Sequence, residues 1–264
     1  GARLRSFSES MVSYALQVCQ KRGYPNDNIR ILGRDHPTQK QEFLDTLQTL
    51  ALPESPEKGL RLFLYLVGDC SPEGDFVFDN NETISAQQLL DTLNVLQTSY
   101  STLEVILVVD SPYAGKFVEA NADDTSGRRL VIAGTSTKGK GLFIQTLSQL
   151  SFSKYFLGNA YRGEDLWTSY DGAYLSLVDG LKQPEPLLDD DGDGRTTKND
   201  GLLAEKWFIG RRGALAGSDA AAVPTLLRSS EFDSPMSGDV TVWVDVLEAA
   251  VPDRVWVTVV PKDG

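Results

Sequence analysis

Residues 62–67 have the sequence Leu62-Phe63-Leu64-Tyr65-Leu66-Val67, an unbroken run of apolar side chains. A strand with one face in water alternates apolar and polar residues, whereas an unbroken run is typical of a parallel strand that is buried on both faces. Two later runs, Val105 to Val109 and Leu130 to Ala133, have the same character. The sequence therefore predicts a parallel sheet built from buried strands.

Helices are predicted between these strands. Ser6 and Glu9 have the spacing of a capping box, and the apolar residues that follow recur on one helix face until Gly23 ends it. Further helices are predicted near 38–50, near 140–157 and near 163–181, and another begins where Ser85 and Gln88 have capping-box spacing. A short strand is predicted over 29–32 and a hairpin arm over 74–79. This alternation predicts an α/β fold in which a mostly parallel sheet lies between helices, as three layers.

The composition changes towards the end of the chain. Residues 188–200 form a dense acidic loop, and beyond it two segments rich in Val and Trp, 239–247 and 254–260, have the character of β-strands. We therefore predict an α/β domain over 1–212, which includes the acidic loop. A linker and a partial, β-sandwich-like segment are expected over 213–264.

The charge of the chain restricts its partners. The formal net charge of −12 disfavours nucleic acid and anionic membranes and favours cations or basic protein surfaces. No apolar run approaches the ~20 residues that cross a bilayer, and no signal peptide is evident. The two cysteines, Cys19 and Cys70, are too few for a disulfide framework, so we expect both thiols to be reduced.

Two turns are candidates for a functional site. In open α/β sheets, ligands and chemistry collect at the carboxyl ends of the strands. Gly68-Asp69-Cys70 follows the strand that ends at Val67, and the turn from Asp110 to Gly115 follows the buried run that ends at Val109. We expect these two turns to lie at the same edge of the sheet.

Five segments resemble the bacterial caspase-like and legumain-like cysteine peptidases, and they occur in the same order along the chain. They are Leu64-Tyr65-Leu66-Val67-Gly68, Ile84-Ser85-Ala86-Gln87-Gln88-Leu89, Val108-Val109-Asp110-Ser111, Ser151-Phe152-Ser153 with Tyr155-Phe156, and the acidic stretch from Asp189 with Asp200-Gly201-Leu202-Leu203-Ala204. The resemblance spans about residues 6–210 and implies a caspase-like fold. It also implies that the two strand-end turns carry a catalytic histidine and a catalytic cysteine.

The chain departs from this family at both catalytic positions. Asp69 stands at the histidine position, and Pro112 stands at the cysteine position. A thiolate is needed to attack the peptide carbonyl and an imidazole to move the proton, and proline offers neither a nucleophile nor a backbone N–H. The resemblance therefore implies a pseudo-peptidase without a catalytic residue, which binds a protein or peptide or serves as a structural module.

An active cysteine endopeptidase remains the alternative. Cys70 is the best substitute nucleophile, since it comes one residue after the vacated histidine position, but it needs a base. The only histidine, His36, falls in a predicted loop and is expected at the surface, and Ser111 has no evident histidine partner. We expect Cys70 to be a packed thiol near a strand end.

The acidic loop matches the spacing of an EF-hand calcium loop. Counting Asp189 as position one, oxygen ligands fall at the positions where the ion needs them, and Gly194 occupies the sharp turn at position six. The predicted ligands are Asp189, Asp191, Asp193, Asp200 and, through its backbone carbonyl, Arg195. A helix is expected over 202–208. A solvated acidic linker without metal is the alternative, and a structural calcium ion is the prediction.

One further departure concerns the sheet. The caspase-like family begins with a central buried strand before its first helix, and this sequence starts almost at that helix. Either the strand lies outside the sequence, another chain supplies it, or the strand order differs. A calcium-organised domain of a larger surface or secreted protein is a third functional hypothesis, and it goes with an extracellular or cell-envelope location.

Overall fold

The structure is a computed structural model, and it describes most of the first 210 residues and two short strands beyond them. The described residues are 2–33, 37–49, 60–123, 128–141, 151–180, 185–210, 226–229 and 244–246. His36 and the predicted strand over 254–260 lie outside them.

The central sheet has four strands in the order β1-β5-β6-β7. β1 (Leu60–Val67), β5 (Leu103–Asp110) and β6 (Arg129–Ala133) are parallel, and β7 (Leu187–Asp189) is antiparallel to β6. β1 and β5 pair over their full length, so that Val67 lies opposite Asp110. The predicted mostly parallel sheet is confirmed, although β7 was not foreseen because its residues belong to the acidic stretch.

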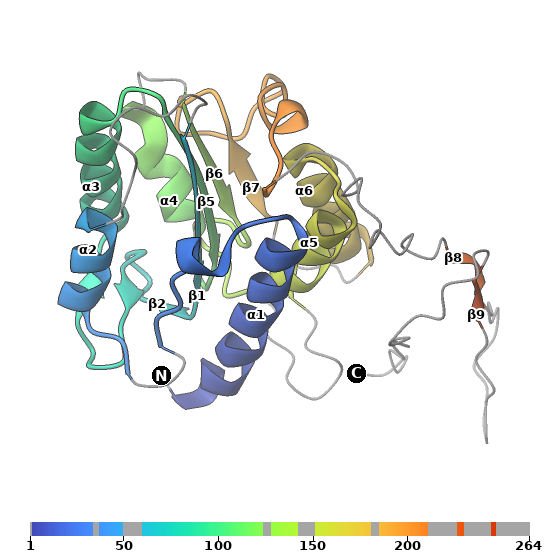
Figure 1. Ribbon diagram of the computed structural model, residues 1–264, viewed down its shortest axis with the longest axis horizontal. Coiled ribbons are helices and arrows are strands. Elements are labelled where there is room, and N and C mark those ends of the chain that lie inside the picture. Colours follow the sequence, from blue (N-terminus) through green and yellow to red (C-terminus); the bar gives the residue numbers. More distant parts are fainter. Residues whose placement is uncertain are drawn as a thin grey trace.

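Helices cover both faces of this sheet, which confirms the three-layer α/β/α arrangement (Figure 1). On one face lie α2 (Lys40–Gln48), α3 (Ala86–Ser99) and α4 (Gly115–Glu119); on the other lie α1 (Ala2–Lys21), α5 (Phe152–Arg162) and α6 (Leu166–Leu175). The short helices are η1 (Asn26–Asn28), η2 (Ala120–Asp123), η3 (Ser176–Gly180) and η4 (Ala204–Lys206).

β5 supplies the centre of both cores. Successive side chains of a strand point to opposite faces, so Val105 and Leu107 pack against α3 while Ile106 and Val108 pack against α5 and α6. All four are 0% exposed. The two faces explain why this run contains almost no polar residue, because each position lies under a helical layer.

A small antiparallel sheet extends from the carboxyl end of β1. It consists of β2 (Asp69–Cys70), β3 (Phe76–Val77) and β4 (Thr83–Ile84), in agreement with the predicted arm. The arm leads into α3, where the Ser85 side chain accepts from the Gln88 N–H and the Gln88 side chain accepts from the Ser85 N–H. This capping box is the one that the sequence predicts.

Three local predictions are wrong. Residues 29–32 form no strand, because in the described part of the chain no neighbour pairs with them. The helix expected over 202–208 is reduced to the single 3-10 turn η4. α1 begins at Ala2, so Ser6 lies inside the helix and not at its start.

The end of the chain contributes one described strand pair. β8 (Leu226–Ser229) and β9 (Val244–Val246) are antiparallel, and β9 falls inside the strand predicted over 239–247. The division at residue 212 stays a prediction, since residues 211–225 lie outside the described part. None of the described helices combines the length and the apolarity needed to cross a bilayer.

Candidate functional site

The two strand-end turns meet, as the sequence predicts. The N–H of Gly68 donates to the carbonyl of Asp110 across the ends of β1 and β5, at 3.4 Å. One step further, the Cys70 Sγ lies 3.0 Å from the Ser111 Oγ in a buried hydrogen bond. Asp69 and Pro112 therefore stand on adjacent turns at the carboxyl edge of the sheet, and each is partly exposed.

Cys70 is a buried thiol, as expected for a packed residue. Its side chain belongs to a core cluster and is only 5% exposed. Burial raises the pKa of Cys70 to about 12; the Ser111 hydrogen bond offsets part of this rise, and the negative charges of Asp69 and Asp75 add smaller increases. Because the thiolate is the nucleophilic form, this environment suppresses the reactivity of Cys70.

The turn that carries Pro112 is tightly held. Tyr113 adopts the left-handed conformation with φ 57°, which is uncommon for a residue with a side chain, and its N–H donates to the Gly139 carbonyl at 2.7 Å. Gly115 has no room for a side chain, since a Cβ there would lie 2.5 Å from the backbone nitrogen of Thr137. The rigid turn presents a proline ring at the edge of the sheet.

Asp110 is the buried acid of this region. It is 2% exposed, and its carboxylate accepts from the Ser153 N–H at 2.9 Å, near the start of α5. The Ser153 hydroxyl also bonds to the Tyr65 hydroxyl at 2.6 Å. Burial raises the pKa of Asp110, and the hydrogen bonds from Ser153 offset part of the effect. Asp110 thus ties β5 to α5, a structural role that its place in the sequence did not reveal.

Replacing Asp110 with Asn is expected to flatten the pH dependence of stability. Because the pKa of Asp110 is raised in the folded state, the folded protein holds this proton more tightly than the unfolded chain, and stability falls as pH rises from about 4. Asp110→Asn removes a slope of up to about 1.4 kcal/mol per pH unit in that range. Urea unfolding of both proteins at several pH values measures it; equal slopes would contradict the assignment.

The acidic loop brings three of its predicted ligands together. Carboxylate oxygens of Asp189, Asp191 and Asp193 all lie within 4.8 Å of one another. Asp189 is buried at the end of β7, while Asp191 and Asp193 are exposed. Oxygen atoms at this separation form a cluster that fits a metal ion.

Backbone donors hold Asp189 in place. Its carboxylate accepts from the N–H groups of Gly192 and Gly194, at 2.8 and 2.9 Å, and from the Asn121 side chain at 3.1 Å. Burial raises the pKa of Asp189 to about 6, and the charge of Asp200 adds to the rise. Gly194 turns with φ 73°, and a Cβ there would lie 2.7 Å from that of Ala122, so the predicted need for glycine has a second, steric reason.

Asp200, a fourth predicted ligand, is not part of this group of three carboxylates, and the fifth, Arg195, was predicted through its backbone carbonyl. Asp200 is 8% exposed and accepts from the N–H groups of Asp190 and Thr197, at 3.0 and 2.5 Å. Arg195 is exposed, and its N–H donates to Asp193 at 2.8 Å. Asp200 therefore links the start and the end of the acidic loop by accepting from two backbone N–H groups. This role requires an acceptor side chain at position 200.

Asp190 is an organising residue that the sequence reasoning missed. One of its oxygens accepts three backbone N–H groups, from Gly201, Leu203 and Ala204, at 3.0, 2.9 and 2.8 Å. Asp190 is 4% exposed. It occupies position two of the loop, where a ligand pattern assigns nothing, so ligand spacing carries no signal for it.

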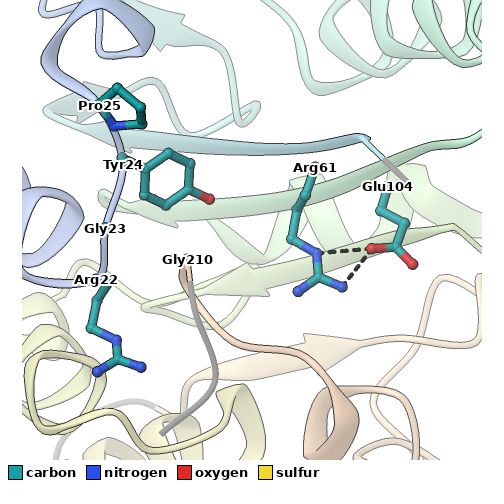
Figure 2. A pocket seen from close by; sticks show the side chains of 7 residues that line it. All are labelled: Arg22, Gly23, Tyr24, Pro25, Arg61, Glu104 and Gly210. Carbon is teal, nitrogen blue, oxygen red and sulfur yellow. Dashed lines mark hydrogen bonds and ion pairs between the residues drawn. The ribbon is translucent and has the colours of Figure 1, made fainter. Parts of the chain in front are cut away.

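A pocket of about 290 Å³ lies at the opposite end of the strands, and Figure 2 shows the residues that line it. Arg61 and Glu104, which project from the starts of β1 and β5, form an ion pair at 2.5 Å. The Arg61 guanidinium also lies over the Trp207 ring at 4.8 Å. Because Glu104 and Trp207 already contact the Arg61 guanidinium, this pocket is a weaker candidate for ligand binding than the edge at the carboxyl ends of β1 and β5.

Both cysteines are free and buried, in agreement with the expectation of reduced thiols. Comparison of the chain with protein-family models and with curated proteins finds no match. The grounds for proposing a function are therefore the three-layer fold, the paired turns at the carboxyl edge and the acidic loop.

Proposed function

We propose that this chain is a catalytically inactive relative of the bacterial caspase-like and legumain-like cysteine peptidases, and that it binds protein or peptide. The proposal is supported by the adjacency of the two turns that contain Asp69 and Pro112, the residues that the resemblance assigns to the histidine and cysteine positions. A carboxylate beside a proline lacks both the thiol nucleophile and the imidazole that this family uses for acyl transfer.

The alternative nucleophile has an unfavourable environment. Cys70 is buried, and its pKa of about 12 leaves almost no thiolate at neutral pH. Its hydrogen-bond partner is the Ser111 hydroxyl, which is not a base at neutral pH. A peptidase that used Cys70 would first have to expose and deprotonate this thiol.

The acidic loop belongs to the same proposal as a structural calcium site. Three clustered carboxylates, one of them buried, repel one another without a cation. Calcium prefers oxygen ligands at this kind of spacing, and Asp189, Asp191 and Asp193 would supply the first of them. Calcium loops of modest affinity fill where the ion is millimolar, which is the reason for proposing an extracellular or cell-envelope location.

The test of the proposed function is an assay of peptide hydrolysis. The purified chain is expected to cleave a fluorogenic peptide library no faster than buffer, with or without calcium. Cys70→Ser tests the alternative nucleophile, and Cys19→Ser is the matched control at the other buried thiol. Hydrolysis that survives Cys19→Ser and disappears in Cys70→Ser would establish a cysteine peptidase and overturn the proposal.

A further inference from the structure

The acidic loop has a buried neighbour from a distant part of the chain. Asn121 lies in η2, and its side-chain N–H donates to the Asp189 carboxylate at 3.1 Å, although the two residues are 68 positions apart in the sequence. Asn121 is 1% exposed. The loop packs directly on this segment, because a Cβ at Gly194 would lie 2.7 Å from that of Ala122 and 2.9 Å from the Glu119 carbonyl oxygen. Asn121 is therefore held against the acidic loop.

The side-chain oxygen of Asn121 is a buried acceptor without a donor. Among the described residues, no group donates a hydrogen bond to this Oδ1. A buried carbonyl oxygen that lacks a partner costs about 1–3 kcal/mol. The group that the Asn121 amide contacts is the Asp189 carboxylate, which in its ionised form only accepts. A cation beside this carboxylate satisfies both residues at once, since calcium takes carboxylate and amide oxygens as ligands.

The acidic loop by itself does not supply the closing ligand of a calcium site. Calcium takes about six to eight oxygen ligands, and in an EF-hand loop a carboxylate at position twelve gives the ion two of them. Position twelve is Asp200, and both of its oxygens already accept backbone N–H groups. Asp200 is also absent from the cluster of Asp189, Asp191 and Asp193. An oxygen from outside the loop is therefore expected to complete the shell.

We infer that Asn121 is a ligand of the ion that the acidic loop binds, and that its side-chain oxygen takes the place that position twelve has in an EF-hand loop. The ligand class is a hard divalent cation of the size of calcium. An ion held in this way cross-links β7 to η2, the segment that follows α4 and the Pro112 turn. The inference rests on the calcium site proposed above and deepens it.

Two substitutions at Asn121 separate a ligand from a residue that only orients Asp189. Asn121→Ala removes both the oxygen and the N–H, whereas Asn121→Asp removes the N–H and keeps an oxygen of the same reach. In isothermal titration of the full chain with calcium, the Kd of Asn121→Ala is expected to be at least about tenfold weaker. The Kd of Asn121→Asp is expected to be no weaker than that of the natural chain, since added ligand charge strengthens calcium binding. Affinity that is unchanged in Asn121→Ala, or that falls in Asn121→Asp, would overturn the inference.

Asn199→Ala is the matched control. It removes an exposed amide from the same loop and keeps the Asn199 N–H that donates to the Thr197 side chain, so its calcium Kd is expected to equal that of the natural chain. Terbium substitutes for calcium, and its luminescence lifetimes in H2O and D2O count the waters bound to the ion. Asn121→Ala is expected to add one water and Asn199→Ala none. Equal water counts in Asn121→Ala and the natural chain would contradict the assignment of Asn121 as a ligand.

If neither Asn121 variant folds, the natural chain decides. The carbon-13 signal of the Asn121 side-chain carbonyl is expected to shift as calcium is added, with the Kd found by calorimetry, and a signal that does not move would refute the inference. A flat calorimetric titration of the natural chain refutes the calcium site itself. Calcium binding in which Asn121 has no part removes this inference alone. The proposal of an inactive peptidase is tested separately, by the hydrolysis assay.

Discussion

Asp190→Ala is expected to lower the free energy of unfolding by about 3–5 kcal/mol, because a buried acceptor serving three donors is lost. The N–H groups of Gly201, Leu203 and Ala204 all donate to one oxygen of Asp190. Without it, these donors stay in a region where Gly201 and Ala204 are buried, and each loses a charge-assisted hydrogen bond. Urea unfolding with and without the substitution measures the difference.

Two controls separate this effect from a general loss of charge. Asp190→Asn keeps an acceptor oxygen and is expected to cost about half as much as Asp190→Ala. Asp91→Asn removes one negative charge from an exposed site on α3 and is expected to change stability by less than about 0.5 kcal/mol. If Asp190→Ala behaved like Asp91→Asn, the hydrogen-bond network assigned to the loop would be wrong.

Calcium at about 100 times its Kd is expected to stabilise the chain by about 2.7 kcal/mol relative to the protein in EDTA. For a chain of this size, that corresponds to a rise in Tm of about 5–10 °C. The physical reason is that the calcium site proposed at the carboxylates of Asp189, Asp191 and Asp193 is assembled only in the folded state. Thermal unfolding followed by circular dichroism, with isothermal titration for the Kd, tests this.

The double variant Asp191→Asn with Asp193→Asn isolates the site. Asp191 and Asp193 accept from the N–H groups of Asp193 and Arg195, and an asparagine carbonyl keeps both bonds while removing two charges. In this variant the melting temperature is expected to be the same in calcium and in EDTA. A calcium effect that persists there, or a flat titration of the natural chain, would refute the calcium site and leave the acidic loop as a metal-free linker.

Much of the fold could be predicted from short stretches of the sequence. The unbroken apolar runs of β1, β5 and β6 predicted parallel strands because burial on both faces leaves no position for water-facing residues. Ser85 and Gln88 predicted the start of α3, since a capping box needs only four neighbouring residues. The same rule failed at Ser6, since α1 begins at Ala2 and Ser6 lies inside the helix.

Contacts between residues that lie far apart in the sequence could not be predicted from it. No local sequence signal marks Arg129 as buried, yet it is 1% exposed, and its guanidinium donates to the Leu90 carbonyl and the Asn94 side chain. Residues 29–32 have the composition of a strand, but a strand requires a paired neighbour, and no described segment provides one. Asp190 likewise acquires its role only when residues 201–204 fold back onto it.

The candidate site also combines features that the sequence determines with features that depend on the tertiary structure. The amino-acid sequence by itself determined which groups are available: a carboxylate at position 69, a proline at position 112 and a glycine-punctuated row of aspartates. Only the tertiary structure decided that the Cys70 thiol is buried against Ser111 and that, among the described residues, β1 pairs with β5 alone. Residue chemistry is a local property of the chain, whereas burial and pairing depend on which distant segments pack together.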